Sequence, residues 1–260
     1  MGKCRNCNQC KYKCNQYGDI EIRKEYIVAL AGNPNVGKST VFNELTGLKQ
    51  HTGNWPGKTV ANARGNYDYL ESKFEIVDLP GTYSLFANSV EEEIARDFIC
   101  FEKPDVTIVV IDATALERNL NLVLQVLELT DKVVICLNLI DEAKKKGLLI
   151  DIPGLENELG VPVVGTIARD GKGLEQLKNE ILLVASGYKI NKPKAIKYNE
   201  EIESLVEEII PSIEELSTEI NSRWLALRIV DGDYKILSGV KEHLLKVDKE
   251  DWYGELKGKI

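Results

Sequence analysis

The chain has 260 residues, of which 43% are hydrophobic and 28% charged, and its formal net charge at pH 7 is −8. This composition supports a sizeable core without disulfides, and it argues against nucleic acid as a main ligand because nucleic-acid binding usually needs a basic face. No apolar run approaches the ~20 residues of a membrane helix, and no signal peptide is visible. We therefore expect a soluble, cytoplasmic chain with one large domain or a domain plus an appendage.

Four of the six cysteines lie close together at the N-terminus. Cys4, Cys7, Cys10 and Cys14 have the C-x₂-C-x₂-C-x₃-C spacing of a bacterial ferredoxin, except that Asn15 replaces the following proline. Neighbouring basic residues favour thiolates. We predict one metal centre here, either an iron–sulfur cluster, Zn²⁺ or transiently bound Fe²⁺. The alternative is a mobile tail whose thiols are merely kept reduced.

A glycine-rich loop lies between a predicted strand and a predicted helix. Residues 32–39 fit the pattern G-x-x-x-x-G-K-[ST], between an apolar run over 26–31 and helical spacing over 38–46. In such a loop, backbone N–H groups and a helix dipole bind a polyphosphate. Lys38 is expected to reach the β- and γ-phosphates, and the Ser39 hydroxyl to ligate Mg²⁺. The residues expected around the phosphates are Asn33, Pro34, Asn35, Val36, Gly37, Lys38, Ser39 and Thr40.

A second strand end carries residues suited to a metal-bound phosphate. The tetrapeptide Asp78-Leu79-Pro80-Gly81 follows the strand-like run 73–78. The Asp78 carboxylate can hold Mg²⁺ through water, and the N–H of Gly81 can approach the γ-phosphate. Leu79 and Pro80 complete the turn, and all four residues are expected beside the nucleotide.

Two more strand ends are suited to a purine base. Asn138-Leu139-Ile140-Asp141 follows the run 132–137. Asp141 can accept the ring N–H and the exocyclic amino group of guanine, and a mismatched base would leave its carboxylate unpaired. Asn138 is expected to brace the loop and approach the base. After the strand over 161–165, the residues expected to give backbone contacts to the base are Thr166, Ile167 and Ala168.

The residue that usually orients the attacking water is absent. Thr82 follows Gly81 where Ras-like GTPases have glutamine, and Tyr83 is a poor substitute. We therefore expect slow intrinsic hydrolysis, or hydrolysis that depends on charge supplied from elsewhere. Asn35 could ligate a monovalent cation beside the β/γ-bridge, although the same residue also suits a tight turn.

Four stretches together resemble the cytosolic N-terminal region of the bacterial ferrous iron transport protein B (FeoB) family. They are residues 32–40, the Gly-Asn-Trp-Pro-Gly-Lys-Thr-Val stretch 53–60, residues 78–85, and the Trp-Leu-Ala-Leu-Arg stretch 224–228. The resemblance implies a GTP-hydrolysing G domain and a small helical domain, joined in the whole protein to a membrane domain that carries Fe²⁺. A small cytosolic accessory protein and a second copy of the chain are the other partners considered.

The resemblance also implies roles for individual residues. Thr59 becomes the switch threonine that ligates Mg²⁺ and senses the γ-phosphate, and the loop around Trp55 closes over K⁺ near Asn35. The loop residues implied in binding are Asn54, Trp55, Pro56, Gly57 and Thr59, and the candidate catalytic residues are Asn35, Lys38, Thr59 and Gly81.

Two positions depart from the family pattern. Lys58 stands where an apolar residue is usual, and Ala61 stands where an acidic residue is common. An added cation could alter nucleotide affinity or compete with K⁺. We interpret Lys58 as a solvated loop lysine.

The predicted fold is an α/β P-loop GTPase G domain, with a mixed, mostly parallel six-stranded sheet, followed by a small all-helical domain. Residues 1–24 form the Cys-rich tail, 25–187 the G domain and 188–260 the helical domain. Strands are expected near 26–31, 64–70, 73–78, 105–111, 132–137 and 161–165, and helices near 38–46, 89–101, 117–130, 151–159 and 172–186. A turn at Glu71-Ser72 makes a hairpin, Ser89 caps a helix, and Cys100 and Cys136 are expected in the core.

Two other functions compete with a GTPase of iron uptake. A GTP-dependent assembly or RNA-processing switch would share the phosphate loop and Asn35, but the acidic balance argues against it. A metal-sensing module, with the cysteine tail at its centre, would make hydrolysis incidental.

Overall fold

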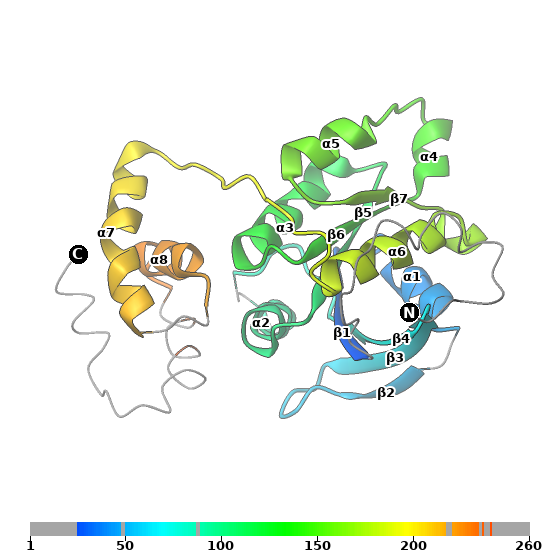
Figure 1. Ribbon diagram of the computed structural model, residues 1–260, viewed down its shortest axis with the longest axis horizontal. Coiled ribbons are helices and arrows are strands. Elements are labelled where there is room, and N and C mark those ends of the chain that lie inside the picture. Colours follow the sequence, from blue (N-terminus) through cyan, green and yellow to red (C-terminus); the bar gives the residue numbers. More distant parts are fainter. Residues whose placement is uncertain are drawn as a thin grey trace, which may run out of the picture.

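A mixed β-sheet forms the centre of the larger of the two parts that the structure describes (Figure 1). The computed structural model describes residues 25–47, 50–86, 89–216 and 220–233, together with 236 and 240. Within these residues the sheet has seven strands in the order β2-β3-β4-β1-β5-β6-β7. The strands are β1 (Glu25–Gly32), β2 (Gln50–Asn54), β3 (Ala61–Tyr69), β4 (Ser72–Asp78), β5 (Val106–Asp112), β6 (Val133–Asn138) and β7 (Val163–Gly165).

Strand pairing explains the mixed character of the sheet. The pairs β1–β4, β1–β5, β5–β6 and β6–β7 are parallel, whereas β2–β3 and β3–β4 are antiparallel. Buried parallel strands need apolar residues on both faces, and β5 and β6 are buried at almost every position. The predicted fold class is confirmed, but the predicted number of six strands is wrong because β2 was missed.

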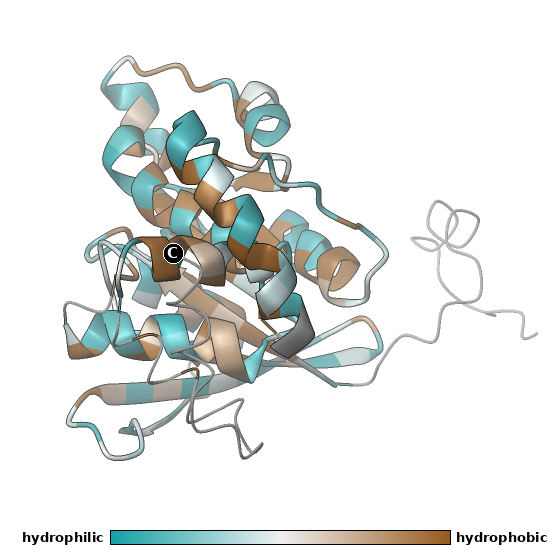
Figure 2. Ribbon diagram, turned by 90° about the vertical axis from the view of Figure 1, so that its left-hand side faces the viewer, coloured by the Kyte–Doolittle hydropathy of each residue, from teal (hydrophilic) through white to brown (hydrophobic). Residues whose placement is uncertain are grey.

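Helices cover both faces of the sheet (Figure 1). Buried residues of α1 and α6 pack on one face with Val28, Ile76 and Val134, and those of α2 and α3 pack on the other with Val77, Val109 and Ile135. Figure 2 shows apolar and polar residues alternating along the helices, as expected for helices with one buried side. The helices of this part are α1 (Lys38–Thr46), α2 (Val90–Asp97), α3 (Leu116–Leu129), α4 (Ile140–Lys145), α5 (Ile152–Leu159) and α6 (Leu174–Ala185).

The ends of α2 and the β3–β4 turn differ in part from the sequence predictions. Ser89 caps α2 by accepting a hydrogen bond from the Glu92 N–H at 3.2 Å, as predicted. The helix predicted over 89–101 instead changes from α2 into a π-helix, η2 (Phe98–Glu102). The β3–β4 turn lies at Leu70-Glu71 rather than Glu71-Ser72, because Ser72 already pairs with Tyr69. Cys100 and Cys136 are buried, as predicted.

A second, helical part follows a linker, residues 186–199, between α6 and the next helix. The Asn191 side chain donates to the carbonyl oxygens of Asp131 and Val133, at 2.7 and 2.9 Å, which fixes the linker to the start of β6. Helices α7 (Glu200–Leu216) and α8 (Ser222–Val230) then pack on each other through a separate apolar cluster, which Cys100 of η2 also joins. None of the helices in the described ranges is both long and apolar enough to span a bilayer.

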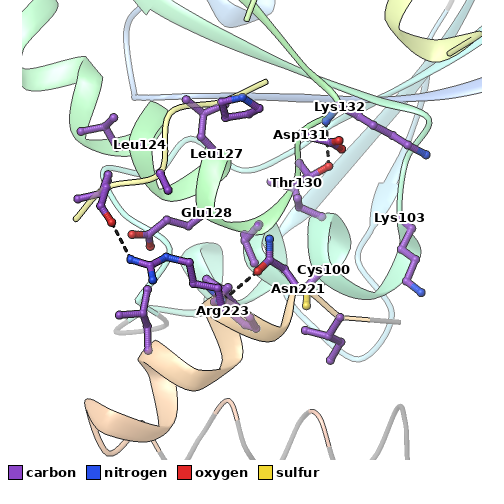
Figure 3. A pocket seen from close by; sticks show the side chains of 18 of the residues that line it. Cys100, Lys103, Leu124, Leu127, Glu128, Thr130, Asp131, Lys132, Asn221 and Arg223 are labelled. Carbon is purple, nitrogen blue, oxygen red and sulfur yellow. Dashed lines mark hydrogen bonds between the residues drawn. The ribbon is translucent and has the colours of Figure 1, made fainter. Parts of the chain in front are cut away.

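A cavity of about 510 Å³ lies where the end of α3, η2, the linker and α8 meet (Figure 3). Arg223 on its α8 side pairs with Glu203 of α7 at 2.8 Å and donates to the Ile196 carbonyl oxygen at 2.8 Å. None of the residues lining this cavity belongs to the candidate site described next.

Candidate functional site

The glycine-rich loop joins the end of β1 to the start of α1 and has a strained, compact backbone. Gly37 has φ +85° and Asn35 has φ +66°, a left-handed conformation that glycine adopts freely and asparagine tolerates. A Cβ on Gly37 would lie 2.4 Å from Asn138 Nδ2, and one on Gly32 would lie 2.7 Å from the Val110 carbonyl oxygen. Glycine is therefore required at both ends of the loop.

Side chains of the loop point in two directions. Asn35 and Ser39 are exposed, whereas Asn33 is buried and neither of its polar side-chain atoms has a hydrogen-bond partner within the described structure. Pro34 and Thr40 are half-buried. The Asn35 amide and the Ser39 hydroxyl are therefore available to a ligand.

Lys38 lies against the end of β4. Its ammonium group pairs with the Asp78 carboxylate and donates to the Leu79 carbonyl oxygen at 2.7 Å. Burial raises the pKa of Asp78 above its ordinary value, and the nearby Lys38 charge opposes that shift. The structure thus brings Lys38 and Asp78 together, with Ser39 next to Lys38 in the chain.

The segment after Asp78 runs beside the glycine-rich loop. The Leu79 N–H donates to the Leu30 carbonyl oxygen at 3.0 Å, and the Thr82 N–H to that of Gly32 at 3.3 Å. A Cβ on Gly81 would lie 3.5 Å from Pro34 Cα, so the two segments touch. Pro80 is half-buried, while Thr82 is buried, and its short side chain faces protein rather than solvent.

The segment 55–60 is anchored by a buried tryptophan. Trp55 packs edge-on against Phe98 with ring centroids 5.6 Å apart, and its backbone N–H donates to the Val60 carbonyl oxygen at 2.9 Å. Lys58, which we interpreted as a solvated loop lysine, remains 36% exposed and also forms an ion pair with Glu93 of α2 at 3.1 Å. The remaining loop residues implied in binding are exposed: Asn54, Pro56, Gly57 and Thr59.

Asn138 connects three segments of the site. Its Nδ2 donates to the Val36 carbonyl oxygen at 3.1 Å, and its Oδ1 accepts hydrogen bonds from Thr166 Oγ1 at 3.2 Å and from the Ala168 N–H at 3.1 Å. The side chain is buried. The glycine-rich loop is therefore fixed to the 166–168 loop through one amide, with Leu139 (φ +63°) turning the chain into α4.

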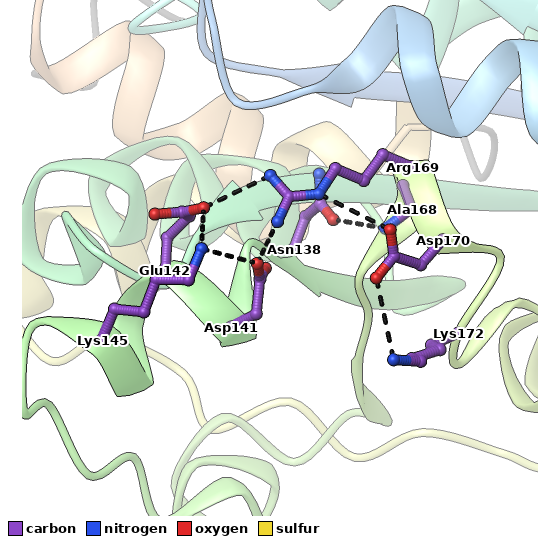
Figure 4. Close-up of polar contacts among 8 residues, drawn as sticks. All are labelled: Asn138, Asp141, Glu142, Lys145, Ala168, Arg169, Asp170 and Lys172. Carbon is purple, nitrogen blue, oxygen red and sulfur yellow. Dashed lines mark hydrogen bonds and ion pairs between the residues drawn. The ribbon is translucent and has the colours of Figure 1, made fainter.

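Asp141, in the first turn of α4, has two unequal carboxylate oxygens (Figure 4). Its Oδ1 is buried and has no hydrogen-bond partner among the described residues. Its Oδ2 pairs with the Arg169 guanidinium and lies 3.7 Å from Lys145 Nζ. Sequence reasoning missed both partners of Asp141: it assigned only backbone roles to the loop that contains Arg169, and it assigned no role to Lys145 of α4.

The site therefore forms at the carboxyl ends of neighbouring strands. β1, β4 and β6 end at the glycine-rich loop, Asp78 and Asn138, and β7 leads to Thr166. This edge is where doubly wound sheets bind ligands. Ile167 is half-buried and Ala168 is buried there. The cysteines of the predicted metal centre, Cys4, Cys7, Cys10 and Cys14, lie outside the described residues.

The family models and the first curated relatives that match this chain are those of ferrous iron transport proteins. The family model described as ferrous iron transport protein B matches residues 26–181, and the model of the FeoB cytosolic helical domain matches residues 198–255. The chain is 41% identical over 211 residues to an Fe(2+) transport protein A/Fe(2+) transporter FeoB fusion protein of Porphyromonas gingivalis, covering 79% of this chain and 25% of that protein. The chain spans about a quarter of the length of the first curated relatives that it matches.

Solved structures of one relative match over most of the chain. The cytosolic domain of the T. maritima FeoB iron transporter in its GDP form I superposes with a TM-score of 0.77 at 40% identity, covering 90% of this chain and 93% of that one. The GMPPNP form of the same domain gives a TM-score of 0.77 at 37% identity, covering 90% and 92%.

Proposed function

This chain belongs to the ferrous iron transport protein B family, and from that membership we propose that it binds and hydrolyses GTP as the G-domain part of a ferrous iron transporter. Relatives solved in GDP and GMPPNP forms support a guanine nucleotide as its ligand. The reaction converts GTP and water to GDP and phosphate.

The observation that carries the proposal is the unpartnered Oδ1 of Asp141 beside the Asn138 bridge. A buried acceptor without a donor is costly, and a base that presents adjacent N–H donors relieves that cost. Guanine presents them and adenine does not. Asn138 fixes the phosphate loop and the base loop to each other, so phosphate and base are recognised at a set separation.

At the phosphate end the donor set suits Mg²⁺, which prefers oxygen ligands. The Ser39 hydroxyl, the Asp78 carboxylate and the Thr59 hydroxyl would hold it. Bound Mg²⁺ supplies charge stabilisation of the phosphates. Lys38, which pairs with Asp78, would neutralise the β- and γ-phosphates, and the Gly81 N–H would approach the γ-phosphate.

Hydrolysis by this chain is proposed to be slow on its own and faster with K⁺. Thr82 is buried and cannot orient water as a glutamine would. The Asn35 amide is exposed on the loop, where it would hold K⁺. K⁺ would supply the charge that an arginine finger supplies in other GTPases.

Assignments for the whole protein are proposals from the family. Residues 25–187 would form the G domain and 188–260 the helical domain, joined to a membrane domain on the cytoplasmic side of the inner membrane. Hydrolysis would gate or regulate Fe²⁺ uptake. The fusion to Fe(2+) transport protein A in the P. gingivalis relative supports a small accessory partner. The N-terminal cysteines would bind a metal centre, and a second copy of the chain is a further partner.

Phosphate release from GTP and from ATP, measured with Mg²⁺ and K⁺ present, tests the proposed activity. We expect phosphate release from GTP and not from ATP, and we expect Lys38→Ala to lose the release from GTP. Lys194→Ala is the matched control, because it removes the same charge and Lys194 pairs with Glu158 of α5, which is not a residue of the candidate site. Equal release from ATP, or unchanged release in Lys38→Ala, would contradict the proposed function.

A further inference from the structure

The two oxygens of Asp141 differ in what they contact. Oδ1 is buried and unpartnered within the described structure, whereas Oδ2 holds the Arg169 guanidinium. A guanine base offers two adjacent donors, its ring N1–H and its 2-amino group, and full recognition needs both oxygens. One of the two oxygens, Oδ2, is already paired with the Arg169 side chain.

The Arg169 guanidinium that occupies Oδ2 resembles the edge of guanine in its hydrogen-bond donors. A guanidinium presents N–H donors in a planar fork, and the guanine edge contains the same arrangement of a ring N–H beside an amino group. Arg169 also donates from Nη1 to Glu142 Oε1 at 3.3 Å, so its fork spans two carboxylates (Figure 4). Lys145 pairs with Glu142 at 3.0 Å and approaches the same Asp141 oxygen.

We propose that Arg169 is a specificity-determining residue that competes with the 2-amino group of guanine for Asp141 Oδ2. The inference rests on the proposed function, since it assumes that Asp141 reads the base. Arg169 then lowers the affinity for a base with two donors and leaves nearly unchanged the affinity for a base with one donor, which Oδ1 alone can accept.

The Arg169 side chain is free enough to move away from Asp141 when a base binds. Its side chain is 52% exposed, and Glu142 and Asp170 lie within ion-pair distance of the same guanidinium. The guanidinium can therefore leave Asp141 and remain paired with other carboxylates. An exposed pair of this kind is weak and is screened by salt, so the competition tunes binding and does not block it.

Binding of GDP and of inosine diphosphate (IDP) to the whole chain tests the proposal, because inosine lacks only the 2-amino group. In Arg169→Ala we expect GDP affinity to rise by about two- to fivefold, the range expected for an exposed ion pair, and IDP affinity to change little. Lys172→Ala is the matched control: it removes the same charge, and the contact of Lys172 within the network is with Asp170 at 3.7 Å.

Two additional measurements separate competition from other roles. In an Asp141→Asn background, Arg169→Ala should no longer alter the GDP-to-IDP ratio, since the contested oxygen is gone. In the wild-type background, the gain for GDP should shrink as salt increases. Equal changes for GDP and IDP, or a loss of GDP affinity, would overturn the proposal and would show that Arg169 stacks on the base or orients Asp141. If the wild type bound GDP and ADP equally, the proposed function itself would fail.

Discussion

Lys38 and Asp78 form an ion pair across the junction of the glycine-rich loop and β4, and both side chains are largely buried there. The Lys38 ammonium also donates to the Leu79 carbonyl oxygen at 2.7 Å. Lys38 therefore neutralises a carboxylate within the fold, in addition to its proposed contact with phosphate. Substitution at Lys38 should affect both nucleotide binding and stability.

Lys38→Ala should abolish tight nucleotide binding while the chain still folds, because the loop backbone does not depend on the lysine. It should lower the free energy of unfolding at pH 7 by about 1–3 kcal/mol, since a largely buried carboxylate loses its partner. Calorimetry with GDP and denaturant unfolding measure the two effects. Wild-type GDP affinity in this variant would mean that the phosphate site is misplaced.

The stability loss in Lys38→Ala should depend on pH. Burial raises the folded-state pKa of Asp78 above its unfolded pKa of about 4. Protonated Asp78 therefore contributes stability that is fully present below the unfolded pKa. This contribution is lost as the pH rises through the folded-state pKa. Removing the lysine charge raises that pKa further. The deficit relative to wild type should therefore be small near pH 4 and reach its full size at neutral pH. In an Asp78→Asn background the pH-dependent part of the deficit should vanish.

Asn138→Ala should weaken both the fold and the site. It leaves the Val36 carbonyl oxygen and the Ala168 N–H without their side-chain partner, which should lower the free energy of unfolding by about 2–4 kcal/mol. GDP affinity should fall as well, because the two loops are no longer fixed to each other. Asn121→Ala on the exposed face of α3 is the control and should be near neutral; similar losses in both variants would contradict the bridging role.

The sequence predicts the buried elements of the fold well and the edge elements poorly. The apolar runs of β1, β5 and β6 are too short for helices and are bounded by turns, so each is identified correctly. In contrast, β2 reads Gln-His-Thr-Gly-Asn, which has no apolar alternation. It becomes a strand only by pairing with β3. The switch from α2 to the π-helix η2 is likewise set by packing, because Phe98 contacts Trp55 while Cys100 faces the helical part.

In the site, motif spacing identifies residues that lie at or just after the end of a strand. It does not identify pairs of residues that only meet in the folded chain. Asp78, Asn138 and Asp141 each follow an apolar strand and were predicted from that position. The pairs Arg169–Asp141 and Lys58–Glu93 join residues 28 and 35 positions apart along the chain. Neither pair has a local pattern, so only the folded chain shows that these charges meet.

Hydrolysis should be faster in K⁺ than in Na⁺, and Asn35→Ala should remove the difference. The reason is the buried Thr82 in place of a water-orienting glutamine, combined with an exposed Asn35 amide on the loop. A full arginine-finger charge is worth ~10³–10⁵ in rate, so even a partial substitute should be measurable. Phosphate release in KCl and NaCl at matched ionic strength makes the comparison, and identical turnover would rule out the cation site.

Guanine recognition by Asp141 is the central claim, and calorimetric titration of the chain with GDP and ADP tests it most directly. We expect GDP to bind far more tightly than ADP, because guanine supplies donors to the unpartnered Oδ1 and its neighbouring oxygen. Asp141→Asn should lose this preference and gain affinity for xanthosine diphosphate, whose 2-oxo group can accept from the new amide. Equal affinity of the wild-type chain for GDP and ADP would contradict the claim.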